Sequence, residues 1–260
     1  MDFFNSKIKL KDLNIEVPFS QYLFMKESIP EEHLKKYAHV GKLIGEAMWT
    51  VPHWYPANLN VLEILGENWD GKKTGESWTI AQINENITTG FYDDNEQLIK
   101  ELLELLSDEL PSKYEQAFDE MKFAFSNEKY ILCAAALFIL IDGLTQDANG
   151  YSKVCSTFNK KSATDNKGYN PPAILGEINA INKFLNKIYS KVNFDNFNEI
   201  TLIENNRHTF LHGKKLVADK LQCVRLLNCA FSVFSVGKCV SSIAKKIHNS
   251  EQLQHDSNVF

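Results

Sequence analysis

The sequence lacks the features that mark a secreted or membrane protein. Its five cysteines are an odd count with no Cys-x-x-Cys pair, so neither a disulfide framework nor a zinc knuckle is indicated. The longest dense apolar stretch, residues 131–141, has eleven members, whereas a membrane helix needs roughly 18 or more. Residues 1–5 lack the basic start and long apolar segment of a secretion signal. We therefore expect a reduced, cytoplasmic protein without a membrane partner.

An excess of basic residues is also missing, because the net charge is −5. The charge is nevertheless uneven along the chain. Residues 93–120 hold ten acids and two lysines, whereas residues 151–247 hold fifteen Lys and Arg and six acids. This asymmetry suggests an anionic partner for the second half. The alternative is that the charges solvate outer helix faces and cancel between neighbours.

Tryptophan separates the first 92 residues from the rest, since all four tryptophans of the chain lie there. Between residues 8 and 17, apolar and polar residues partly alternate, which allows a short strand or an extended arm. Pro30 then opens a helical pattern that continues to Met48. We predict an N-terminal region over 1–92 that is mostly helical, with a fold and a role that the sequence leaves open.

From residue 95 the apolar period is consistently that of helices. The spacing predicts helices over 98–106 and 114–125, then one over 130–144 that is apolar on nearly all sides, as a central bundle helix is. Polar residues 145–173 predict a long loop.

Two further helices are predicted beyond this loop. The first covers 174–192 and carries a stripe of lysines, Lys183, Lys187 and Lys191, that either tracks phosphates or faces water. The second covers about 219–248, and its apolar surface is wider than one stripe. One of its sides would then face the bundle and the other a second protomer.

The densest group of reactive side chains lies just before the last helix. Asn206 is a good helix N-cap, and Gly213 suits the left-handed position after a helix end. A short helix over 207–212 is therefore predicted, with an arginine and two histidines on it.

Helical geometry limits how these side chains can cooperate. His208 and His212 are four residues apart and share a face, whereas Arg207 and His212 diverge by roughly 140°. Arg207 and His212 would meet more easily across a two-fold axis, where the same patch of two protomers comes together. This suggests a composite site in a homodimer.

These residues resemble a known motif. Arg207, His208 and His212 match the arginine, polar residue, three variable residues and histidine of the HEPN superfamily (higher eukaryotes and prokaryotes nucleotide-binding domains). Asn206 and Gly213 are similar to the Asn-Arg-His…His-Gly form of bacterial defence members. The expected helix order over about 95–248 also resembles the HEPN architecture.

The fold expectation is therefore an all-α protein. A HEPN-like bundle of four or five helices would cover residues 93–250, after the N-terminal region 1–92. Residues 251–260 would form a flexible tail.

Asp142 interrupts the longest apolar run, and a carboxylate buried without a partner would be costly. HEPN members often place an acid on the second bundle helix near the motif arginine, so the resemblance makes Asp142 the partner of Arg207. The alternative is that Asp142 lies at an exposed helix end.

The resemblance implies a metal-independent endoribonuclease of toxin or antiviral type, with RNA as substrate and no cofactor. His212 would take the proton of the 2′-hydroxyl, and Arg207 would bind the phosphate, leaving a 2′,3′-cyclic phosphate. His208 would orient the substrate or share the proton transfer, and Asp142 would fix Arg207. An antitoxin or sensor protein is a further expected partner.

Two other interpretations stay open at this point. One is a noncatalytic module that dimerises or binds nucleotide or protein through the same pocket. The other takes His208 and His212 as two metal ligands on one helix face. That second interpretation is disfavoured because Arg207 beside them would repel a cation and no His-Glu-x-x-His arrangement is present.

Overall fold

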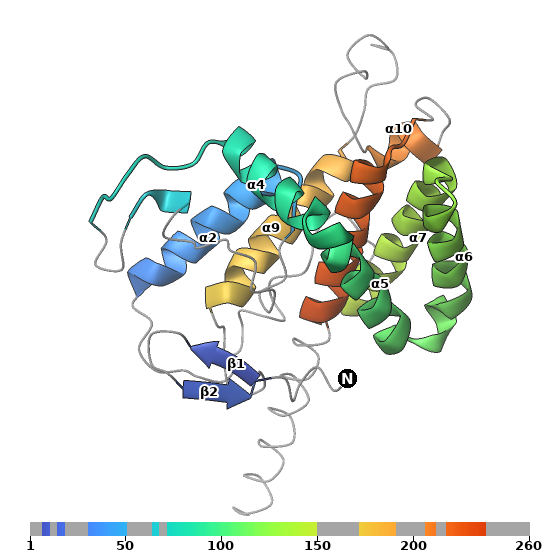
Figure 1. Cartoon of the computed structure of the whole chain (residues 1–260), viewed down its shortest axis with the longest axis horizontal. Coiled ribbons are helices and arrows are strands. Elements are labelled where there is room, and N and C mark those ends of the chain that lie inside the picture. The colour runs from blue at the N-terminus through green and yellow to red at the C-terminus, as the bar shows by residue number, and fades with distance from the viewer. Residues whose placement is uncertain are drawn as a thin grey trace, which may run out of the picture.

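The computed structural model describes residues 7–10, 15–18, 31–50, 64–67, 72–149, 172–190, 206–211 and 217–237. These residues are mainly helical, and a small antiparallel hairpin of β1 (Lys7–Leu10) and β2 (Ile15–Pro18) lies at one edge of the helical body (Figure 1). The hairpin pairs Ile8 with Val17, in the stretch whose alternation allowed a strand. The predicted all-α class is confirmed for the helical body.

Most helices follow the predicted periods closely, but the helix over residues 80–92 has no counterpart among the predicted helices. The helices are α2 (Glu31–Glu46), α4 (Ile80–Tyr92), α5 (Gln97–Glu109), α6 (Glu115–Ser126), α7 (Tyr130–Ala148), α9 (Pro172–Ile188) and α10 (Arg207–Leu211). One more helix, over residues 220–237, carries no label in Figure 1, and we call it the core helix. Local signals set some of the ends. Thr79 begins α4 through a capping box with Gln82, and α5 ends just before Pro111.

The core helix occupies the centre of the molecule. Residues 223–233 are all buried, and Figure 1 places the helix between α9 and α7. The prediction that one side of this helix faces a second protomer is wrong for the described part, because the chain itself buries both sides. Residues 238–248, the rest of the predicted helix, lie outside the described residues.

Polar side chains on the core helix form hydrogen bonds with Thr50, which lies four residues beyond the end of α2. The Asn228 amide donates to the carbonyl oxygen of Thr50, and it also lies 3.2 Å from Thr50 Oγ1. The Ser232 hydroxyl donates to the same Oγ1 at 2.9 Å. Because all three residues are buried, these bonds satisfy groups that would otherwise destabilise the core.

Helix α7 has an exposed apolar side, which the sequence did not predict. Leu132 and Ile139 leave 64% and 62% of their surface exposed, although Leu137 and Ile141 on the other side are buried. The prediction of a central, fully covered helix is therefore wrong for this face. In the described part of the chain, α7 is also the one helix long and apolar enough to cross a membrane. Length and composition alone do not separate such a helix from a core helix.

Helices α2 and α9 pack closely along their length, side by side in Figure 1. A methyl group at Gly41 would overlap the backbone of Gly176, and one at Gly45 would overlap Ala180 and Lys183. Glycine on α2 therefore allows the two backbones to approach. As a result, the N-terminal helix shares one hydrophobic core with helices beyond residue 93.

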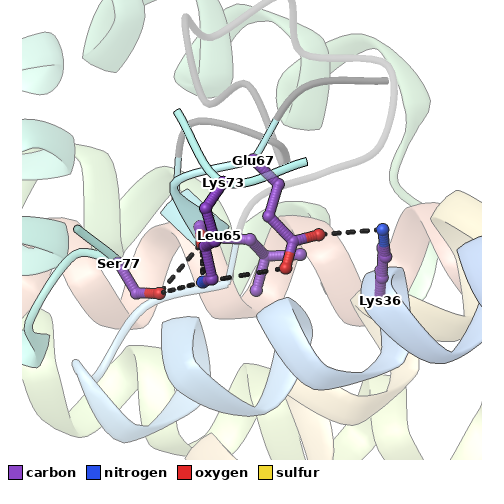
Figure 2. A network of polar contacts seen from close by, with 5 residues as sticks. All are labelled: Lys36, Leu65, Glu67, Lys73 and Ser77. Carbon is purple, nitrogen blue, oxygen red and sulfur yellow. Dashed lines mark hydrogen bonds and ion pairs between the residues drawn. The ribbon is translucent and has the colours of Figure 1, made fainter. Parts of the chain in front are cut away.

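A polar network ties residues 64–67 to α2 (Figure 2). Lys36 of α2 pairs with Glu67 at 2.8 Å, and Lys73 Nζ lies 3.7 Å from the other carboxylate oxygen. Lys73 Nζ and the Ser77 hydroxyl both donate to the carbonyl of Leu65 at 2.9 Å. The hydrogen bond from Lys36 lowers the pKa of Glu67 below its usual value. The network therefore links residues 64–67 and 73–77 to one another and to α2.

Candidate functional site

The candidate site is a junction of three elements: α7, the C-terminal end of α9 and α10. Figure 1 shows α10 at the upper end of α7, which it contacts, and the Asn206 side chain just before α10 bonds Ser190 just after α9. An aromatic contact supports this position, because the rings of Phe210 on α10 and Phe138 on α7 lie 5.6 Å apart. Both side chains are buried, so α10 is anchored by its apolar side.

Arg207 and Asp142 form an ion pair at this junction. Arg207 Nη2 lies 2.6 Å from Asp142 Oδ2, and the two side chains leave 27% and 17% of their surface exposed. The predicted pairing of these residues is therefore confirmed, and the alternative of an exposed helix end for Asp142 is wrong. Arg207 keeps enough exposed surface for its planar group to reach an anion as well.

Tyr189 completes the contacts of Asp142. Its hydroxyl donates to Asp142 Oδ1, while the Arg207 guanidinium lies 5.6 Å from the centre of the Tyr189 ring. The two carboxylate oxygens are therefore held by different donors, and the cation also interacts with the aromatic face.

Burial has the largest effect on the pKa of the Asp142 carboxyl. It raises the pKa of Asp142 above the usual value, while the nearby charges of Arg207 and His208 act in the opposite direction. His208 thus lies close enough to influence the carboxylate, as a member of the same site. The His208 side chain itself is neither fully buried nor fully exposed.

Asn206 links α10 to the end of α9. Its carbonyl accepts the hydrogen bond of the Phe210 N–H at 3.0 Å, the first turn of α10. Its side-chain amide donates to the carbonyl and hydroxyl oxygens of Ser190, at 3.0 and 2.9 Å. Since Asn206 is buried, these bonds fix where the helix starts and therefore where Arg207 points.

The predicted proton-transfer residue is not placed by the structure. Helix α10 ends at Leu211, and His212 and Gly213 lie outside the described residues. The structure therefore brings together Arg207, Asp142 and His208 from the predicted site. The roles assigned to the four residues stay predictions.

Comparisons with protein-family models, with curated proteins and with solved structures found no match to this chain.

The predicted lysine stripe on α9 does not form a free basic surface. Lys183 pairs with the Glu46 carboxylate at 3.1 Å, and Lys187 Nζ donates to the Glu46 carbonyl at 2.6 Å. Burial lowers the pKa of Lys187. Both lysines thus bind the last residue of α2, one through its carboxylate and one through its carbonyl, while Lys191 lies outside the described residues. No cluster of three potential metal ligands occurs in the part of the chain that the structure describes.

Tyr189 is the site residue that sequence reasoning missed. It follows Leu185 by four positions on the apolar face of α9 and directly follows Ile188, so its pattern is that of a core aromatic. The available signal was indirect: an isolated acid in an apolar run needs more than one donor, because a carboxylate has two oxygens to satisfy.

Proposed function

We propose that the chain is a metal-independent endoribonuclease of the HEPN type, acting as a toxin or in antiviral defence. Its site would be composite, built by two copies of the chain. The observation that carries the proposal is the Arg207–Asp142 ion pair at the start of α10, which holds the motif arginine at a partly open junction.

The chemistry requires few groups, because RNA supplies its own nucleophile. The 2′-oxygen attacks the adjacent phosphorus as a histidine, His212, takes its proton. The 5′-oxygen leaves and takes up a proton, and a 2′,3′-cyclic phosphate remains. Arg207 stabilises the charge on the phosphate oxygens, since its planar group matches them. His208, beside Asp142, orients the substrate or shares the proton transfer.

A second candidate is a noncatalytic binding module that dimerises or holds a protein partner. The exposed apolar side of α7 favours it, because Leu132 and Ile139 precede Asp142 on the same helix. Exposed apolar residues next to a polar site are typical of interaction surfaces. This module would bind nucleotide or protein without cutting RNA.

The deciding experiment is incubation of the purified protein with labelled tRNA and mRNA in EDTA. Wild type, Arg207→Ala, His212→Ala and the control Lys220→Ala are compared. Lys220 pairs with Glu96 at 2.6 Å, with 35% of its side chain exposed, so it matches Arg207 as an ion-paired cation outside the site. We expect cleavage to cyclic phosphate ends by wild type and Lys220→Ala, and a loss of about 100-fold or more in the other two variants. Equal cleavage by all four proteins contradicts the assignment.

Mixing the two inactive variants tests the composite site. If Arg207 of one copy works with His212 of the other, a mixed dimer of Arg207→Ala and His212→Ala regains one intact site. We expect partial activity after unfolding and refolding the variants together, and a dimer by light scattering. An inactive mixture, or a strictly monomeric wild type, contradicts the dimeric site.

A further inference from the structure

We infer that Tyr189 is a positioning residue of this site, which sets the orientation of Asp142 and thereby keeps part of the Arg207 guanidinium open to phosphate. The inference rests on the proposed function for its activity measurement. Its structural basis is the contact of one carboxylate with two donors from different elements.

The division of the carboxylate oxygens is the first observation. Arg207 Nη2 approaches Oδ2 at 2.6 Å, and the Tyr189 hydroxyl donates to Oδ1. A carboxylate that is free to turn often binds a guanidinium with both oxygens and takes two of its N–H groups. With Oδ1 held by Tyr189, Asp142 is prevented from turning in this way. Arg207 then keeps donors for a substrate phosphate.

The position of Tyr189 in the chain is the second observation. It directly follows α9, and its N–H still donates to the carbonyl of Leu185 at 2.9 Å. The next residue, Ser190, binds the side chain of Asn206, the residue that starts α10. The end of α9 therefore holds both partners of the ion pair: Asp142 through Tyr189, and Arg207 through Asn206.

Helix α7 carries a matched arrangement at Asp147, which does not involve Asp142 or Arg207. The Tyr114 hydroxyl donates to Asp147 at 2.8 Å, Lys113 pairs with Asp147 at 2.6 Å, and the Lys113 ammonium lies 4.8 Å from the centre of the Tyr114 ring. Burial raises the pKa of Tyr114 to about 12, so its hydroxyl stays protonated near neutral pH. Tyr114→Phe removes one tyrosine-to-aspartate hydrogen bond on α7 without touching Arg207.

The experiment compares Tyr189→Phe with Tyr114→Phe in the full-length protein. Both variants keep the ring and lose only the hydroxyl. We expect Tyr189→Phe to lower kcat/KM for RNA about tenfold, in part through a higher KM, as a lost hydrogen bond to a charged group does. Tyr114→Phe should stay within about twofold of wild type, because the Tyr114 hydroxyl bonds Asp147 and its loss leaves the contacts of Asp142 with Arg207 and Tyr189 intact. Thermal unfolding of both variants shows whether either effect comes from loss of the fold.

A second measurement is independent of cleavage. Carbon NMR of proteins labelled at aspartate, with the Asp142 signal assigned through Asp142→Asn, follows the titration of this carboxyl. A hydroxyl that donates to a carboxylate favours its ionised form, so Tyr189→Phe should raise the pKa of Asp142, and Tyr114→Phe should leave it unchanged.

The outcomes separate the inference from the proposed function. An unshifted Asp142 titration in Tyr189→Phe overturns the inference, whether or not the protein cuts RNA. Unchanged cleavage kinetics in Tyr189→Phe, with an active wild type, also overturn it and leave the endoribonuclease assignment standing. A wild type that cuts no RNA refutes the proposed function, and the shifted titration then still supports Tyr189 as the residue that positions Asp142.

Discussion

At the residue scale, the Arg207–Asp142 ion pair forms although partial burial removes water from the Asp142 carboxylate. Burial has the largest effect on the pKa of Asp142 and raises it, although the Arg207 guanidinium lies next to the carboxylate. A partly buried ion pair of this kind contributes little net stability, because desolvation offsets the attraction. What the ion pair does contribute is a fixed direction for the Arg207 side chain.

This balance predicts a pH dependence of stability. Because the pKa of Asp142 is raised, the folded protein binds this proton at a pH where the unfolded chain, with a carboxyl pKa of about 4, has lost it. Stability from this group is therefore present at low pH and falls as pH rises through the raised value. We expect the free energy of unfolding of wild type, relative to Asp142→Asn, to fall from pH 4 upward and then level off. Urea unfolding between about pH 4 and 7 measures it, and a difference that grows with pH contradicts it.

Sequence patterns reach only some of these residues. Asp142 stands out because it interrupts an apolar run, and Arg207 stands out through its neighbours in the motif. Tyr189 does not, because its contact depends on where the end of α9 meets α7, 47 residues apart in the chain. Likewise, Lys183 and Lys187 bind Glu46 of α2, and the spacing of the lysines along α9 does not reveal this partner.

At the scale of elements, periodicity predicts the helices well but not their positions. Residues 130–144 are nearly all apolar, and yet Leu132 and Ile139 of α7 are exposed. The core helix carries Asn228 and Ser232 and is buried all the same, because Thr50 supplies their hydrogen bonds. Which helix is central therefore depends on partners that are distant in the sequence, rather than on the apolar pattern alone.

The close approach of α2 and α9 predicts the effect of a single methyl group. Alanine favours a helix over glycine by about 1 kcal/mol, but at Gly41 the methyl would overlap the backbone of Gly176. We expect Gly41→Ala to destabilise the protein by about 1–3 kcal/mol through this overlap. Chemical unfolding measures the change.

Gly90 on α4 is the matched control. A methyl group there meets no atom within 4 Å, so Gly90→Ala should stabilise the protein by about 0.5–1 kcal/mol. Equal effects of the two substitutions would show that helix propensity, rather than the contact of α2 with α9, decides the outcome.

At the scale of the whole molecule, the division predicted at residues 92 and 93 has a direct test. Val40, Ile44 and Trp49 belong to the same core as the helices beyond residue 93. We expect a fragment of residues 93–260 to lose fixed packing, with retained far-UV circular dichroism, weak near-UV signals and binding of an apolar dye. A fragment with a cooperative unfolding transition and native-like near-UV signals would instead establish an autonomous C-terminal domain.

Trp49 sits where three parts of this core meet. Its ring is fully buried and stacks on Phe91 of α4 with 4.9 Å between the ring centres. Its N–H donates to Asn84 at 2.9 Å, and the Arg225 guanidinium of the core helix lies 5.4 Å from the ring centre. The chain therefore carries its own optical probe. Four tryptophans emit, and the share of the emission that comes from Trp49 should shift to longer wavelength once α2, α4 and the core helix separate, so their association can be followed without attaching a dye.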